Sequence, residues 1–127
     1  MNDYLLDTNV IIDFASAEIL KSLNFENINV SSVVLREEIL KQLPDFNFES
    51  IKIINESYLE LEEAYKYKME NKKISFYDAL NLCIAKNRKM QLVTGDQQLI
   101  KFAVQKEVKC FGTIKLLELM VEIKKMM

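Results

Sequence analysis

The most informative stretch of the chain lies near its beginning, where residues 4–12 are YLLDTNVII. Tyr4–Leu6 is a short apolar run that predicts a buried strand, and residues 9–14 have the apolar spacing of a helix. Asp7 therefore stands where a strand passes into a helix. A carboxylate at such a point can cap the helix, because its oxygens accept hydrogen bonds from the free backbone N–H groups of the first turn. It can also belong to a functional site, if further carboxylates lie beside it at the same edge of the fold.

The composition predicts one compact domain over residues 1–127. Half of the 127 residues are hydrophobic, which is enough for a core without disulfides or a structural metal. Only two glycines and one proline are present, so irregular structure must be limited. The cysteines, Cys83 and Cys110, lie in apolar stretches without metal-ligand spacing, and we expect reduced core thiols.

The absence of histidine excludes several classes of site. Ser-His and Cys-His catalysis and His-ligated zinc all require a residue that this sequence does not contain. The net charge of −2 argues against a protein that grips nucleic acid by bulk charge, but it is compatible with a site where metal ions neutralise acids and meet phosphates. Neither a signal-peptide pattern nor an apolar run of membrane-spanning length is evident, so we expect a reduced cytoplasmic location and no membrane partner.

Strand and helix patterns alternate along the chain. Apolar runs predict strands at residues 4–6, 28–31, 90–94 and 107–111, with a marginal edge strand at 51–55. Helical patterns cover residues 9–14, 17–23, 33–43, 58–70, 76–89, 95–104 and 113–125. Ser31 or Ser32 caps the third of these helices and Pro44 stops it, while Ser57 and Glu60 form a capping-box pattern. Strands that alternate with helices predict a parallel sheet covered on both faces.

Three aspartates are predicted to meet at one edge of this sheet, since ligands of such folds bind beyond the carboxyl ends of the strands. Asp7 follows the first strand, and Asp96 follows the strand that ends at Thr94. Asp78 lies in the first turn of a helix capped by Ser75. Taken singly, each aspartate could simply be a helix cap. Taken together, packed carboxylates raise one another's pKa, and a divalent cation reverses that cost.

A glutamate is the fourth candidate, and two adjacent residues compete for the position. Glu37 and Glu38 both lie on the predicted helix 33–43. On a helical wheel, Val33 and Leu40 place Glu37 at the shoulder of the apolar face and Glu38 nearer the middle of the polar face. We therefore favour Glu37, although the doubled glutamate leaves the register open by one residue.

The chemistry of this acidic set points to a hard divalent cation. Oxygen ligands without histidine or thiolate favour Mg²⁺ or Mn²⁺ over zinc. Such an ion activates water, orients a phosphate and stabilises the leaving oxygen. Phosphodiester hydrolysis then needs no nucleophile from the protein, which is consistent with the missing histidine.

Four segments in order, covering nearly the whole chain, resemble PIN-domain ribonucleases: LLDTNVIID, VSSVVLREEI, FYDALNLCIAKNRKMQLVTGDQQL and VKCFGTIKLLEL. The resemblance implies a three-layer α/β/α domain with a mostly parallel central sheet of four to five strands. It implies catalytic and metal-binding roles for Asp7, Glu37, Asp78 and Asp96, with Mg²⁺ or Mn²⁺ as the cofactor. It also implies supporting roles for Asn9 and Thr94, which would orient ligands or waters.

Small members of this family are often VapC-type toxins, so the resemblance implies a metal-dependent endoribonuclease of a type II toxin–antitoxin pair. The implied substrate is RNA, usually tRNA or rRNA, and the implied protein partners are an antitoxin and a second copy of the chain. The alternative is a catalytically inactive PIN-like domain that binds RNA or protein. Glutamines 97 and 98 stand where many relatives have a further acid or a lysine, and residues 45–55 match the family poorly.

Overall fold

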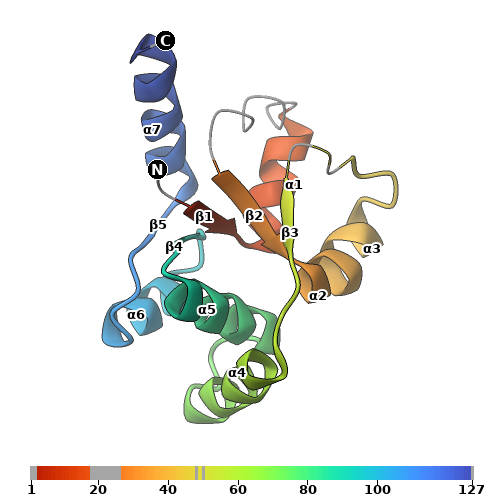
Figure 1. The fold of residues 1–127 in the computed structure, drawn as a ribbon, viewed down its shortest axis with the longest axis vertical. Coiled ribbons are helices and arrows are strands. Elements are labelled where there is room, and N and C mark those ends of the chain that lie inside the picture. The colour runs from red at the N-terminus through yellow and green to blue at the C-terminus, as the bar shows by residue number, and fades with distance from the viewer. Residues whose placement is uncertain (1–2, 18–26, 48, 50, 127) are drawn as a thin grey trace.

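A parallel sheet with β1 in the middle forms the centre of the computed structural model, which describes residues 3–17, 27–47, 49 and 51–126 (Figure 1). Five strands are present in these residues: β1 (Asp3–Leu6), β2 (Asn27–Ser31), β3 (Lys52–Ile54), β4 (Gln91–Val93) and β5 (Cys110–Phe111). Their order is β3-β2-β1-β4-β5, and every pairing is parallel. The order reverses between β1 and β4, and this reversal is the point at which open parallel sheets bind ligands.

The helices lie on both faces of the sheet (Figure 1). They are α1 (Thr8–Ser16), α2 (Ser32–Val34), α3 (Leu40–Gln42), α4 (Tyr58–Glu70), α5 (Phe76–Arg88), α6 (Gln97–Gln105) and α7 (Thr113–Met126). A π-helical segment, η2 (Leu35–Ile39), joins α2 to α3, so the three form one continuous helical run after β2. Across the described part of the chain, no helix combines the length and apolar character needed to cross a membrane.

Two hydrophobic cores cover the two faces, because successive side chains of a strand point to opposite sides. Leu5 and Leu92 belong to the core on the side of α4, α5 and α6. Tyr4, Leu6 and Val93 belong to the core on the side of α1, α2 and α7. Residues 4–6 of β1 are buried on both faces, as the uninterrupted apolar run predicted.

Local capping residues define where several helices begin. The capping box of Ser57 and Glu60 is present at α4, with Glu60 N 3.1 Å from Ser57 Oγ and Ser57 N 2.9 Å from Glu60 Oε1. Ser31 caps the helix after β2 through a 3.2 Å hydrogen bond from Val34 N. These capping residues and the predicted α/β class with its parallel sheet are confirmed.

Two predicted elements differ from the structure or fall outside it. The predicted helix 17–23 lies outside the described residues except for Ala17, which is the C-cap of α1. The strand predicted at 107–111 contains only Cys110 and Phe111. The shortening has a local cause, since Glu107 has a φ of 61° and the backbone N–H of Val108 donates to Ala103 O at 2.9 Å. This Schellman-type ending of α6 uses residues that the strand would need.

Candidate active site

Asp7 occupies the carboxyl end of β1 and is the N-cap of α1. Its backbone N–H donates to Val93 O at 3.1 Å, which extends the pairing of β1 with β4 by one residue. The side chain is 5% exposed, and its Oδ1 accepts a 3.1 Å hydrogen bond from Val10 N. Its Oδ2 accepts a hydrogen bond from Thr94 Oγ1. Asp7 is therefore both a helix cap and a buried carboxylate fixed at the switch point of the sheet.

Thr94 connects Asp7 to the next acid. Thr94 is fully buried, and its Oγ1 accepts a 3.1 Å hydrogen bond from Asp96 N while it donates to Asp7. Asp96 in turn caps α6, because its Oδ1 accepts from Gln98 N at 2.8 Å and from Leu99 N at 3.1 Å. One hydroxyl thus positions the two aspartates that follow β1 and β4.

Asp78 approaches the same edge from the first turn of α5. Its Oδ2 accepts a 3.1 Å hydrogen bond from Ser75 N, in a capping box that the sequence predicted. Burial raises the pKa of Asp78, its hydrogen bonds to Ser75 oppose the rise, and the charges of Asp96 and Glu38 add to it. Burial is also the main cause that raises the pKa of Asp7, against its hydrogen bonds to Thr94 and Val10, and the charges of Asp78 and Asp96 raise it further. The three aspartates therefore share one electrostatic environment.

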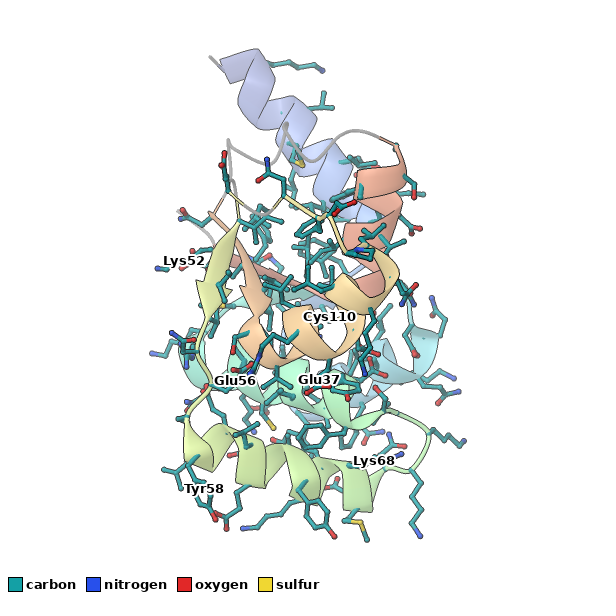
Figure 2. The ribbon with its side chains drawn as sticks, turned by 90° about the vertical axis from the view of Figure 1, so that its right-hand side faces the viewer. Glu37, Lys52, Glu56, Tyr58, Lys68 and Cys110 are labelled. Carbon is teal, nitrogen blue, oxygen red and sulfur yellow. The ribbon has the colours of Figure 1, made fainter. Side chains whose placement is uncertain are left out.

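The structure places Glu38, rather than Glu37, beside this group. Glu38 Oε1 accepts a 2.7 Å hydrogen bond from Thr8 Oγ1, the residue directly after Asp7. Glu37, labelled in Figure 2, has a side chain that is 48% exposed and lies 3.7 Å from Lys41 Nζ. The helical-wheel prediction that Glu37 lies closer to the apolar face than Glu38 is wrong.

The wheel failed because it used the wrong apolar markers. The most deeply buried residues of this helix are Val34, Leu35 and Ile39. Val33 and Leu40, which defined the apolar face on the helical wheel, are only half-buried. Glu38 is four residues after Val34 and three after Leu35, and these spacings place side chains on one helix face. The segment is also π-helical, with Leu40 N donating to Leu35 O, so a uniform step of 100° per residue does not apply.

The two supporting residues have different surroundings. Thr94 lies in the hydrogen-bond network of Asp7 and Asp96. Asn9 is exposed in the first turn of α1, and its side chain makes no hydrogen bond to another described residue. Thr8, which is buried and donates to Glu38, was not among the predicted site residues. Its position between Asp7 and Asn9 was a signal that it could contribute.

The carboxylates of this site suit a cation that keeps several of its water ligands better than a cation coordinated only by protein atoms. Within residues 3–17, 27–47, 49 and 51–126, no group of three or more acidic or cysteine side chains is placed so that it could hold a metal ion. Asp7 accepts one hydrogen bond on each oxygen, and an ionised carboxylate has about four acceptor positions. Mg²⁺ usually binds through one or two carboxylates and keeps several waters. Asp7, with acceptor positions left on both oxygens, is compatible with this mode of binding.

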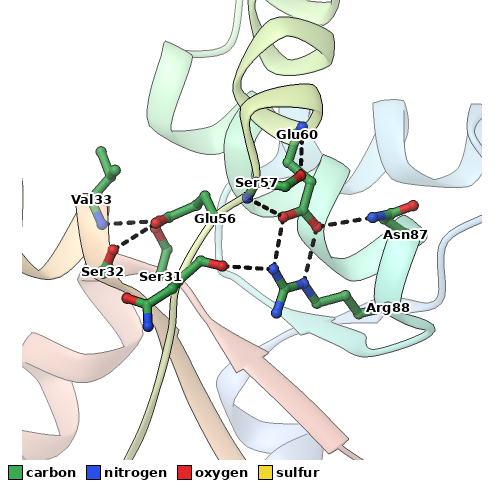
Figure 3. Close-up of polar contacts among 9 residues, drawn as sticks. Ser31, Ser32, Val33, Glu56, Ser57, Glu60, Asn87 and Arg88 are labelled. Carbon is green, nitrogen blue, oxygen red and sulfur yellow. Dashed lines mark hydrogen bonds and ion pairs between the residues drawn. The ribbon is translucent and has the colours of Figure 1, made fainter.

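Glu56 is a further acid near the strand ends that sequence reasoning missed. Its carboxylate accepts hydrogen bonds from Ser31 Oγ, from Ser32 Oγ at 2.6 Å and from Val33 N at 3.0 Å (Figure 3). Burial alone would raise its pKa, but these hydrogen bonds prevail and lower it. Its partners lie more than twenty positions earlier in the chain, so no local pattern signalled them. Figure 2 shows Glu56 between Lys52 of β3 and Tyr58 of α4.

A second carboxylate, that of Glu60, stabilises the connection between β3 and α4. Arg88 donates to both oxygens of Glu60, with Nη2 2.8 Å from Oε1 and Nε 3.0 Å from Oε2 (Figure 3). Asn87 Nδ2 adds a 3.1 Å hydrogen bond, and Arg88 Nη2 also donates to Asn55 O at 2.8 Å. The hydrogen bond from Arg88 is the main cause that lowers the pKa of Glu60 to about 2. Glu56 and Glu60 are thus occupied by structural contacts.

Comparisons with known proteins place this geometry in a structural context. No protein-family model and no curated protein sequence matches the chain. Among solved structures, PAE2754 from Pyrobaculum aerophilum matches with a TM-score of 0.66 and 17% identity, over 98% of this chain and 90% of that one. A toxin–antitoxin complex from Klebsiella pneumoniae matches with a TM-score of 0.57 and 22% identity, over 77% of this chain and 90% of that one.

FitAB bound to the IR36 DNA fragment matches with a TM-score of 0.62 and 20% identity, over 87% of this chain and 94% of that one. At these identities the likeness establishes the fold. The all-parallel sheet, with helices on both faces and β1 next to β4, agrees with this fold. The fold implied by the sequence resemblance is confirmed, and the chain has a PIN-like α/β fold.

Proposed function

We propose that this chain is a Mg²⁺- or Mn²⁺-dependent endoribonuclease that hydrolyses RNA phosphodiester bonds, as the toxin of a type II toxin–antitoxin pair. The observation that carries the proposal is the position of Asp7 and Asp96 directly after β1 and β4, at the switch point of the sheet, with Asp78 in the first turn of α5. The proposal is supported by the repulsion among their charges: those of Asp78 and Asp96 add to the rise in the pKa of Asp7, and that of Asp96 adds to the rise in the pKa of Asp78. A divalent cation offsets such repulsion and binds phosphate at the same time.

The roles of the acids follow from their surroundings. Asp7 and Asp78 are the proposed direct ligands, and Asp96 and Glu38 add negative charge beside them. Glu38 takes the place in this proposal that the sequence resemblance suggested for Glu37, because Glu37 lies beside Lys41 at the surface. Asn9 is proposed to contact substrate or water, since its side chain is exposed close to Asp7 in the chain.

The residues of the chain prepare the site before any cation binds. Thr94 and the backbone of Val10 hold the Asp7 carboxylate in one orientation. Thr8 holds Glu38, and Ser75 holds Asp78. A divalent cation bound here would activate water and stabilise charge on the phosphate. Side chains held in this way need little rearrangement to bind a cation, which favours affinity.

The proposed partners are RNA, an antitoxin and a second copy of the chain. Two of the similar structures support a protein partner, since one is a toxin–antitoxin complex and another is the FitAB assembly on DNA. For the substrate we propose tRNA or rRNA.

The direct test is cleavage of end-labelled tRNA and rRNA by the purified chain, with Mn²⁺ added and then removed with EDTA. We expect cuts at a limited number of sites that require the cation. Cuts that persist in EDTA would contradict the metal-dependent mechanism. RNA binding without any cleavage or Mn²⁺ binding would instead support the alternative, an inactive PIN-like binding domain. The observation that favours this alternative is that no three acidic or cysteine side chains of the described residues are placed so that they could hold a metal ion.

A further inference from the structure

Asn81 has a buried oxygen without a partner among the residues that the structure describes. The residue is 1% exposed, and its Oδ1 forms no hydrogen bond within the described structure. Buried polar atoms in folded proteins are nearly always hydrogen-bonded, and an acceptor without a donor costs free energy. Such an oxygen therefore indicates a partner that is not part of the chain, such as a bound water or ion.

The position of Asn81 on α5 places it on the helix face of Asp78. Asn81 is three residues after Asp78, and this spacing places both on one face of the helix. Helix α5 also contacts β1 and β4, the strands that lead to Asp7 and Asp96.

The direction of helical side chains brings Asn81 closer to the site. In an α-helix the Cα–Cβ bonds tilt toward the N-terminus, so a side chain covers the turn before its own Cα. Asn81 therefore leans toward the first turn of α5, where Asp78 lies. Asn81 lies about one turn after Asp78 along α5, and its side chain is buried.

The chemistry of an amide oxygen suits this position. It accepts hydrogen bonds and binds hard cations, but it adds no negative charge to a group that already includes several carboxylates. Building on the proposed function, we propose that Asn81 is a positioning residue whose Oδ1 accepts a hydrogen bond from a water molecule bound to the cation of Asp7 and Asp78. This contact fixes one water of the hydration shell and so strengthens cation binding.

Calorimetric titration of the whole chain with Mn²⁺ tests this role. Asn81→Leu fills a similar volume without an acceptor, and we expect it to weaken Mn²⁺ binding by about 10-fold or more, the scale on which outer contacts of metal sites act. Its metal-free melting temperature should be equal to or above that of the wild type, because a buried oxygen without a donor is removed. Asn81→Asp keeps an acceptor, and its Mn²⁺ affinity should equal or exceed that of the wild type.

The matched control is Cys83→Ala, which removes a buried side chain of the same helix. Cys83 packs in the core shared with α4, so this change should alter stability and leave Mn²⁺ affinity unchanged. Equal Mn²⁺ affinity of Asn81→Leu and the wild type would contradict the role of Asn81 alone. If the wild type binds no Mn²⁺, the proposed function itself fails, together with this role. Should Asn81→Leu not fold, weaker Mn²⁺ binding by Asn81→Asp would contradict the inference.

Discussion

Thr8 Oγ1 donates a 2.7 Å hydrogen bond to Glu38 Oε1, and this contact joins the beginning of α1 to the helix that follows β2. The same contact orients one glutamate of the adjacent pair toward Asp7 and Asp78. Glu37, its neighbour in the chain, lies at the surface beside Lys41. The pair therefore provides a test in which the control differs from the site variant by a single position.

We expect Glu38→Gln to reduce the rate of metal-dependent RNA cleavage by about 10- to 100-fold, on the scale of residues that support metal sites. Glu37→Gln should stay within about 2-fold of the wild type, because an exposed ion pair with lysine contributes little. Initial rates on one end-labelled RNA at saturating Mn²⁺ compare the two variants. Loss of cleavage in Glu37→Gln with retention in Glu38→Gln would contradict this assignment and restore the one made from the helical wheel.

Thr94→Val should damage the site more than its small change in shape suggests. The variant keeps the volume but removes the hydroxyl that connects Asp7 to Asp96, so Asp7 Oδ2 loses its donor. We expect a loss of about 1–3 kcal/mol in the free energy of unfolding. We also expect Mn²⁺ binding to weaken about 10-fold or more. Thr94→Ser retains the hydroxyl and should remain close to the wild type in both measurements. Equal behaviour of the two variants would show that the hydroxyl has no such role.

The Glu60–Arg88 pair predicts how stability depends on pH. The pKa of Glu60 falls from an ordinary value of 4.5 to about 2 in the folded chain, mainly through the hydrogen bond from Arg88. Its contribution is therefore complete above pH 4.5 and is lost as the pH falls from 4.5 toward 2. Because Glu60 is 3% exposed, this contribution is up to about 3 kcal/mol.

Urea unfolding of the wild type and Glu60→Gln at pH 7, 4.5 and 3 measures this contribution. The difference between the two free energies of unfolding should be largest at pH 7 and should shrink as the pH falls. Glu62→Gln is the control, because Glu62 is an exposed residue of the same helix, 3.9 Å from Lys66 Nζ. A difference for Glu60→Gln that stays constant across this pH range would contradict the assignment.

Glu56 should behave as a structural acid. Its carboxylate accepts three hydrogen bonds from Ser31, Ser32 and Val33. We expect Glu56→Ala to lower the free energy of unfolding by about 1.5–3 kcal/mol, the scale of a hydrogen bond to a charged group. Mn²⁺ affinity of the folded variant should match that of the wild type. A large loss of Mn²⁺ affinity without a loss of stability would instead make Glu56 part of the cation site.

The elements that the sequence predicted well are those specified by nearby residues. The strand at residues 4–6 was evident from its apolar run, and the capping boxes at Ser57 and Ser75 from their glutamate or aspartate three residues later. The aspartates at the strand ends followed from the alternation of strands and helices. Each of these signals is contained within a few neighbouring residues.

The features that sequence reasoning missed depend on contacts between distant segments. The partners of Glu56, and the contacts of Glu60 with Asn87 and Arg88, are more than twenty positions away, so no short pattern signals them. The choice between Glu37 and Glu38 depended on a π-helical segment and on which apolar residues face the core. The Schellman-type ending of α6 shortened β5, because a non-glycine residue, Glu107, adopts a positive φ.

The most direct test of the central claim compares Asp7→Asn with Asp13→Asn. Both variants replace one carboxylate on or beside α1 by an amide of nearly equal size, but Asp7 is buried at the strand ends and Asp13 is exposed. Mn²⁺ binding and cleavage of end-labelled RNA are measured on both, with melting temperature as the check of folding. We predict that Asp7→Asn folds and loses Mn²⁺ binding and cleavage, while Asp13→Asn retains both. Undiminished, Mn²⁺-dependent cleavage by folded Asp7→Asn would contradict the claim that Asp7 is the centre of the active site.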